Sequence, residues 1–278
     1  MGTSLGARQP DGDGAATAGG TGIGTAASPV ILVVALAAER HALRGSLQSA
    51  QHGTLGNRAT VRGTLAGRDV LLVQAGIGRE RARQAVIAAA GTFGAHAVWS
   101  LGFAGGLVDT LRPGDLVCPS VVLDDGEPTS APMAFDASHA AVCAALRRAR
   151  LPVDSGALIT VEAPLRTPDA KRAAHRRSGA VAVEMEAAGV ARAAQALGIP
   201  WAALKVVVDA AGDPLPASLA RCTSPGGDLR WRGLLAGVRE GRRFWQPLLQ
   251  LGRASRLAGR NLWQGFEVAF GAWAALTP

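Results

Sequence analysis

The chain of 278 residues has no tyrosine, only two lysines, three cysteines and few aromatic side chains. Aromatic residues make up 4% of the sequence, and most tryptophans fall near its C-terminal end. Cys118, Cys143 and Cys222 share no CxxC spacing, so neither a disulfide framework nor a zinc finger is indicated, and a reducing cytoplasm is the simplest compartment. The five histidines form no HxH or HExxH pattern, and we therefore expect no metal site.

Long hydrophobic runs are also missing. No uninterrupted apolar run reaches about 18 residues, so a membrane-spanning helix is not expected. The apolar segment 30–38 is too short to span, and no basic region directly precedes it, which argues against a secretory signal. Residues 1–28 are rich in Gly, Ala and Thr and cannot offset their own ordering entropy, so they are predicted to form a flexible tail.

Apolar residues, by contrast, are abundant, and the charge is unevenly distributed. The sequence is 48% hydrophobic and 18% charged, which is enough to bury a sizeable core and excludes a wholly disordered protein. The net charge is +8, and most of it lies in residues 221–278, where arginines far outnumber acids. A nearly neutral body with a basic tail indicates an enzyme that contacts an anionic surface rather than a protein coated by nucleic acid.

Apolar segments alternate with helical patterns between residues 30 and 213. This alternation predicts an α/β layer fold with a central, largely parallel sheet. The predicted strands are 30–36, 54–62, 68–74, 95–101, 115–122, 156–161, 181–183 and 201–208. The predicted helices are 39–49, 79–90, 139–149, 168–177 and 185–197.

Chemically active residues follow several of these strands. Glu39, the glycine-rich turn 102–106 and Asp209 all lie at carboxyl ends of predicted strands, where ligands bind in such sheets. The glycine turn lets a backbone approach a ligand closely, or is a plain tight turn. Burial would raise the pKa of the Asp209 carboxyl and suit it to donate a proton, although it is equally an N-cap candidate. Glu39 is otherwise an ordinary first-turn helix acid.

The segment Val183-Glu184-Met185-Glu186-Ala187 places two acids where a predicted strand becomes a helix. Carboxylates at the mouth of a site can accept hydrogen bonds from paired hydroxyls, such as those of a ribose. The simpler alternative is a solvated helix N-terminus, where the helix dipole favours acids.

Six segments stand in this chain order: VILVVALAAE, QAGIGRERA, LGFAGGL, LRPGDLV, VEMEA and VVVDAAGD. Together they resemble the purine nucleoside phosphorylase and nucleosidase superfamily, most of all its methylthioadenosine/S-adenosylhomocysteine nucleosidases. The resemblance covers roughly residues 30–213 and implies a three-layer α/β/α fold whose mixed sheet curls into a distorted barrel. The chain then divides into a disordered tail (1–28), a nucleosidase-like domain (29–220) and an Arg/Trp-rich helical tail (221–278).

The resemblance also implies roles for individual residues. Glu186 would hold the ribose hydroxyls, with Met185 packed against the sugar and Glu184 beside them. Asp209 would protonate the purine at N7, and Glu39 would position and deprotonate the attacking water. Cleavage of the C–N bond builds positive charge on the sugar, so an acid at the base and a nucleophile on the opposite face form a coherent pair. No metal or organic cofactor is implied.

The expected substrate site also includes three residues from the two glycine-rich segments QAGIGRERA and LGFAGGL: Gly78, Phe103 and Gly105. The sequence departs from the family pattern at three positions: Phe103 and Val208 stand where these nucleosidases often have serine, and Pro164 stands where a phenylalanine stacks on the purine. The 102–107 turn lacks the arginine with which phosphorylases bind phosphate, and Arg79 is a weak substitute. A carboxylate at Glu39 would repel phosphate, which favours water as the nucleophile.

The tail segment RRFWQPLLQLGRASRLAGR is similar to the ends of hopanoid-associated members of the superfamily. Those members remove adenine from adenosylhopane, a lipid-linked adenosine. Its apolar part would need an apolar channel leading out of the active site, and Phe103 can line such a channel. Aromatic and arginine side chains in residues 228–260 predict contact with an anionic membrane surface, so we expect a cytoplasmic or peripheral enzyme. The proline-rich residues 214–226 are predicted to form a linker before this segment, and Pro247 is expected to interrupt its helical pattern.

Several alternatives stay open. The tail can instead pack on the body or on a second copy of the chain in a homo-oligomer; binding of nucleic acid, by stacking of Arg and Trp on bases, is a weaker option that we do not expect. The enzyme can instead act on small nucleosides, as a nucleosidase or a phosphorylase. A protein that only binds a nucleoside or a lipid is the non-enzymatic alternative. The enzyme hypothesis requires Glu39, Glu186 and Asp209 to meet around one nucleoside-sized hollow.

Overall fold

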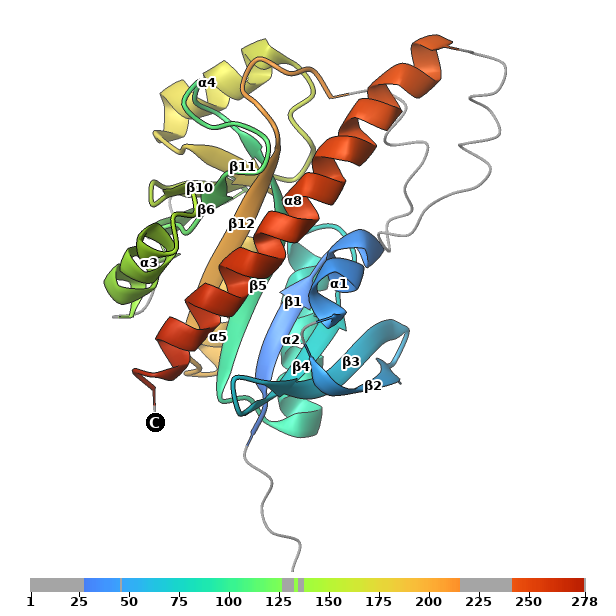
Figure 1. Cartoon of the computed structure of the whole chain (residues 1–278), viewed down its shortest axis with the longest axis vertical. Coiled ribbons are helices and arrows are strands. Elements are labelled where there is room, and N and C mark those ends of the chain that lie inside the picture. Colours follow the sequence, from blue (N-terminus) through green and yellow to red (C-terminus); the bar gives the residue numbers. More distant parts are fainter. Residues whose placement is uncertain (1–27, 46, 127–132, 135–137, 216–241, 278) are drawn as a thin grey trace, which may run out of the picture.

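A mixed β-sheet with helices on both faces forms the body of the chain (Figure 1). The computed structural model describes residues 28–215 and 242–277, without residues 46, 127–132 and 135–137. The strands are β1 (Val30–Val34), β2 (Gln48–Leu55), β3 (Arg58–Leu65), β4 (Arg68–Gln74), β5 (Ala97–Gly106), β6 (Leu116–Val117), β7 (Val121–Asp124), β8 (Met133–Ala134), β9 (Val153–Asp154), β10 (Leu158–Thr160), β11 (Ala182–Glu184) and β12 (Trp201–Asp209). The helices are α1 (Ala37–Arg44), α2 (Arg79–Phe93), α3 (His139–Arg148), α4 (Pro168–Ser178), α5 (Ala187–Ala196) and α8 (Arg242–Ala274).

The centre of the sheet is parallel. β1 pairs in parallel with β4 and β5, and β12 pairs in parallel with β5. All five residues of β1 are buried, as expected for a run of β-branched and leucine side chains that is covered on both faces. Antiparallel pairs join the outer strands β2, β3 and β4 and join β5 to β11, so the predicted mixed, largely parallel sheet is confirmed. The carboxyl ends of β1, β4, β5 and β12 therefore meet at one edge.

Two helix layers cover the sheet, which confirms the three-layer prediction. α2 and α5 pack against each other on one face, where alanines and valines such as Val86 and Val190 share one core cluster. α1, α3 and α8 cover the opposite face through a second cluster that includes Leu43 and Leu146. In Figure 1, α8 runs obliquely across the strands of this face.

The helix α8 is held to the sheet by a cluster of aromatic rings. The Trp99 ring on β5 meets Phe266 edge-on, with centroids 5.6 Å apart, and meets Trp273 in the same way at 6.0 Å. Phe270 lies beside both of these α8 residues and is also fully buried. The C-terminal segment thus contains the predicted helix. The last part of this helix packs on the body, which was the predicted alternative to membrane contact. Pro247 does not interrupt it: the proline lies in the second helical turn, and the helix continues past the one lost backbone hydrogen bond.

Several strand boundaries differ from those predicted. Residues 54–62 are not one strand, because the chain turns at Gly56, which has φ +60°, and passes from β2 into β3. The helix predicted for 39–49 ends at Arg44, and the last two of those residues begin β2. The strand predicted for 115–122 is split into β6 and β7, and Pro119, which cannot donate a ladder hydrogen bond, stands between them. Residues 1–27 and 216–241 lie outside the described chain, so the flexible N-terminal tail and most of the linker stay predictions.

Within the described residues, no helix combines the length and hydrophobicity needed to cross a bilayer.

Candidate active site

Glu39 is a buried carboxylate at the start of α1, just beyond the carboxyl end of β1. Its Oε2 accepts hydrogen bonds from the backbone N–H of Ala35 at 2.9 Å and of Leu36 at 2.8 Å, and its Oε1 accepts one from Phe103 at 2.8 Å. A carboxylate offers about four acceptor positions, so one position on Oε1 is left for a further donor. Burial raises the pKa of Glu39, against the opposing effects of these backbone groups and of Lys205.

The predicted glycine-rich turn 102–106 is the last part of β5, not a turn, and it lies against this carboxylate. Gly102 has φ +143°, and a Cβ at this position would lie 2.6 Å from Oε1 of Glu39. A side chain here would therefore clash with the acid and strain the backbone. This end of β5 is thus the contact surface for Glu39, and the alternative prediction of a plain tight turn is wrong.

Glu184 and Glu186 lie at the junction of β11 and α5. Glu184 accepts hydrogen bonds from the backbone N–H of Ala187, at 2.8 and 3.0 Å, and so caps α5. It also accepts hydrogen bonds from the backbone N–H of Glu186, at 3.0 Å, and from Thr160 Oγ1, at 2.5 Å, and it pairs with Lys205 Nζ at 2.9 Å. Glu186 accepts a hydrogen bond from the backbone N–H of Gly78 at 2.8 Å. Both acids are buried, which rules out the predicted alternative of a solvated helix N-terminus.

Three carboxylates surround a single ammonium in this part of the site. Lys205 is 1% exposed, and its pKa is raised because Glu184, Glu186 and Glu39 together outweigh the effect of burial. The excess of negative groups in this cluster acts most strongly on Glu186. Burial, followed by repulsion from Glu184, raises the pKa of Glu186 to about 8, although Lys205 and the Gly78 backbone act in the opposite direction. At neutral pH Glu186 is therefore mostly protonated in the ligand-free protein.

Asp209 lies at the end of β12 and forms a buried ion pair with Lys171 of α4. The Lys171 ammonium also donates to the carbonyl oxygens of Ala210, at 2.6 Å, and of Asp213, at 3.0 Å. These three acceptors satisfy a lysine that is 0% exposed. Burial raises the pKa of Asp209, while Lys171 acts to lower it.

The strand β5 brings the predicted residues to one edge of the sheet. Gly102 contacts Glu39 and is the register partner of Lys205 on β12. Gly105 lies beside Asp209, whose Oδ2 would be 3.0 Å from a Cβ at that position. The three predicted acids Glu39, Glu186 and Asp209 thus gather around the glycine-rich end of β5 and not on unrelated faces.

The remaining predicted residues are less buried than the acids or are engaged elsewhere. Met185 and Phe103 are half-buried, whereas Pro164 is exposed. Arg79, the weak phosphate candidate, is engaged by Asp124 at 2.5 Å and by Glu162 at 3.7 Å.

Lys171 and Lys205 were not among the predicted site residues. They are the only lysines of an arginine-rich chain, and both are completely buried against acids of the site. Their rarity was the available signal, because lysine is seldom buried unless it is paired.

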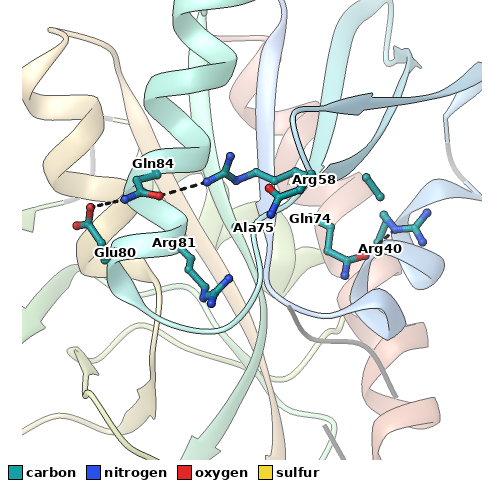
Figure 2. A pocket seen from close by; sticks show the side chains of 9 residues that line it. Arg40, Arg58, Gln74, Ala75, Glu80, Arg81 and Gln84 are labelled. Atoms are coloured by element: carbon teal, nitrogen blue, oxygen red, sulfur yellow. Dashed lines mark hydrogen bonds between the residues drawn. The ribbon is translucent and has the colours of Figure 1, made fainter. Parts of the chain in front are cut away.

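A polar hollow opens at the same edge of the sheet, beyond the end of β4 (Figure 2). Its volume is about 610 Å³, and Arg40, Arg58 and Arg81 contribute to its lining together with Gln74 and other polar residues. Arg40 follows Glu39 in the chain, and its Nε donates to Gln74 Oε1 at 2.9 Å. None of the predicted catalytic residues lines this hollow, and its charged lining is unsuited to an apolar substituent.

Known structures show which class of fold this is. The chain superimposes on a 5'-methylthioadenosine/S-adenosylhomocysteine nucleosidase from Neisseria meningitidis, crystallised with methylthio-immucillin-A, with a TM-score of 0.69 over 88% of this chain and 99% of that chain at 21% identity. A futalosine hydrolase from Helicobacter pylori gives the same TM-score at 15% identity, covering 87% of this chain and 97% of the other. The protein therefore has the nucleoside phosphorylase fold.

The sequence comparisons assign the family. The family model described as Phosphorylase superfamily matches residues 29–221, so the chain belongs to that superfamily, as predicted. A 5'-methylthioadenosine/S-adenosylhomocysteine nucleosidase from Shewanella putrefaciens is 28% identical over 190 residues, which are 63% of this chain and 82% of that protein. One from Bacillus cereus is 27% identical over 199 residues, 66% and 86% of the two chains. The prediction of an enzyme that cleaves N-glycosidic bonds is confirmed at this level.

The raised pKa of Glu186 predicts a pH-dependent stability. The folded protein holds this proton more tightly than the unfolded chain, so the stabilisation is complete below about pH 4.5 and is lost as the pH rises through about 8. The loss is on the order of 1.4 kcal/mol per pH unit between those values. Glu186→Gln keeps a neutral group and an acceptor for Gly78, so its stability relative to the parent should increase over this range, as measured by denaturant unfolding at several pH values.

The exposed Glu267 of α8 supplies the control. Glu267→Gln should follow the parent protein at every pH. If Glu186→Gln also ran parallel to the parent, Glu186 would not hold a proton at neutral pH.

Proposed function

We propose that this protein is a nucleosidase that hydrolyses the N-glycosidic bond of an adenosine-type nucleoside whose 5' position carries a lipid, releasing adenine. The observation that carries the proposal is the meeting of Glu39, Glu186 and Asp209 at the glycine-rich end of β5. The nucleosidase relatives support the reaction, and the similarity of the tail to hopanoid-associated members supports the lipid substituent, with adenosylhopane as the specific candidate.

Each of the three acids would have a different role in hydrolysis. The open acceptor position on Glu39 Oε1 would receive a proton from water, whose oxygen attacks C1' of the ribose as the bond from C1' to the base breaks. Asp209 would donate its proton to N7 of the departing purine. Glu186, neutral at the start, can both donate to and accept from the ribose hydroxyls, with Met185 against the sugar and Glu184 fixing Lys205 behind them.

The substrate is tested by measuring adenine release from adenosylhopane and from methylthioadenosine. We expect faster release per enzyme from the lipid-linked substrate, without any need for phosphate. Preference for methylthioadenosine would contradict the lipid substituent but leave the nucleosidase reaction intact. Absence of release from either substrate, with tight binding of both, would instead favour a binding protein.

Phosphorolysis is a second candidate, favoured by the polar hollow of Figure 2. Arg40 and Arg58 lie beside the carboxyl ends of β1 and β4, and the buried Nε of Arg58 has no hydrogen-bond partner among the described residues. A phosphate held there would need to reach C1' past Glu39. Adenine release that requires phosphate and is lost in Arg58→Gln would establish this alternative over hydrolysis.

Asp209→Asn should abolish adenine release and keep substrate binding, because the amide cannot supply the proton that the leaving base needs. A loss of about 10²- to 10⁴-fold in turnover is the usual scale for a general acid. Asp109→Asn, at an exposed position, is the matched control and should retain full activity. Unchanged turnover in Asp209→Asn would remove Asp209 from the mechanism.

Lys171→Met should move the alkaline limb of the kcat/KM profile to higher pH. The ammonium lowers the pKa of Asp209, so its removal keeps the acid protonated over a wider range. The variant should also lose about 3–5 kcal/mol of stability, because one partner of a buried pair is removed. Arg172→Met, which loses only an exposed pair with Asp169, should change neither property. An unshifted pH limb in a folded Lys171→Met protein would leave Lys171 with a structural role alone.

Membrane contact is proposed for residues 228–256 only, because α8 from residue 258 onward belongs to the core. Deleting the whole tail would therefore unfold the body and test nothing about lipids. A better variant replaces four arginines of α8 with glutamine. They are Arg242, Arg243, Arg253 and Arg256.

This variant should bind anionic vesicles more weakly, by on the order of 1 kcal/mol per arginine, and should release adenine from methylthioadenosine at the parent rate. The control removes the same charge from exposed positions on the body. They are Arg112, Arg148, Arg172 and Arg176. Equal vesicle binding by both variants would contradict a membrane contact through α8.

A further inference from the structure

Two cysteines and a histidine meet on the face of the sheet that α3 and α8 cover. Cys118 follows strand β6, and His139 and Cys143 lie about one turn apart on the same side of α3. One ligand atom from each, two sulfurs and one imidazole nitrogen, all lie within 4.8 Å of one another. Cys118 is 0% exposed, Cys143 is 2% exposed and His139 is half-buried. None of the three belongs to the set of acids and lysines described above.

The spacing of these atoms is close to that of a metal coordination sphere. Zinc binds sulfur at about 2.3 Å and imidazole nitrogen at about 2.0–2.1 Å, so tetrahedral ligand atoms lie roughly 3.5–3.8 Å apart. Cys143 Sγ is 3.4 Å from His139 Nε2. Small side-chain rotations would bring all three atoms onto one ion, and both cysteine backbones are already in place on a strand end and a helix.

The contacts of His139 also describe the metal-free protein. Its Nε2 lies 3.0 Å from the carbonyl oxygen of Cys118, where an Nε2–H group would donate a hydrogen bond. Binding of an ion would require the other tautomer, with the proton on Nδ1 and the Nε2 lone pair toward the metal. His139 therefore has a hydrogen-bond partner in the metal-free protein, and metal binding would replace this contact.

We propose that Cys118, His139 and Cys143 form a binding site for a thiophilic divalent cation, Zn²⁺ in the first place. Two thiolates and one neutral imidazole are a ligand set that zinc prefers, and three protein ligands leave a fourth position for water or another small ligand. The ion would join β6 to α3, and β6 in turn pairs with β12, where Val117 is the register partner of Lys205. Zinc would thus stabilise the strand that carries the buried lysine of the active site.

The test uses the reduced full-length protein after treatment with a chelator. Calorimetric titration with Zn²⁺ should show one equivalent bound, with a rise in the thermal midpoint, and Co²⁺ in its place should give the absorption of a thiolate complex. Cys118→Ser, Cys143→Ser and His139→Gln should each weaken binding at least tenfold. Cys222→Ser and His52→Gln, the latter at an exposed position on β2, are matched controls that should bind like the parent.

A measurement without substitutions covers the case in which a core variant fails to fold. Zinc should slow the alkylation of Cys118 and Cys143, followed by peptide mass spectrometry, and should leave the rate at Cys222 unchanged. The proposal is overturned if no zinc binds, if binding survives all three substitutions, or if zinc protects Cys222 alone. Equal alkylation rates with and without zinc would also overturn it.

Discussion

The ammonium of Lys205 is the group on which the arrangement of this site depends. It is completely buried in the sheet, and three buried carboxylates act on it: Glu39 from α1, and Glu184 and Glu186 from the junction of β11 and α5. One cation cannot neutralise three anions at low dielectric, so the cluster retains a proton, and Glu186 is the residue that holds it. The same cation fixes Glu184, which caps α5 and so sets the position of Glu186.

The glycines of β5 make this crowding possible. At Gly102 the Glu39 carboxylate occupies the space of a side chain, and at Gly105 Asp209 lies almost as close. Because these two positions of β5 have no side chains, Glu39 of α1 and Asp209 of β12 can both lie against the strand. The acids nevertheless have different cations: Lys205 pairs with Glu184, near Glu186 and Glu39, while Lys171 pairs with Asp209. Separate partners let the proposed nucleophile side and leaving-group side be tuned independently.

The core strands and the site acids could be predicted from local patterns in the sequence. The pairs formed between residues far apart in the chain could not be predicted, because no local pattern marks them. The apolar run of β1 and the acids of VEMEA are visible within a few residues. Lys171 lies 38 positions before Asp209, and only the folded chain brings them together. The same reason hid the cluster of Cys118 and His139, whose spacing matches no sequence motif. The hairpin at Gly56 was missed because β2 is almost entirely exposed and shows no apolar alternation.

The packing of α8 on the body limits which part of the C-terminal segment can contact a membrane. After Asp209 the chain is held by Lys171 of α4, which donates to the carbonyl oxygens of Ala210 and Asp213. Leu215 N–H donates to the carbonyl oxygen of Arg166, just before α4, and α8 packs its aromatic residues on Trp99. The segment proposed to contact a membrane therefore runs directly into the part of α8 that is anchored on the body. A free tail would only raise the local concentration of enzyme at a membrane. A segment anchored in this way would also restrict how the active site faces the surface, which a lipid-linked substrate needs and a small soluble nucleoside does not.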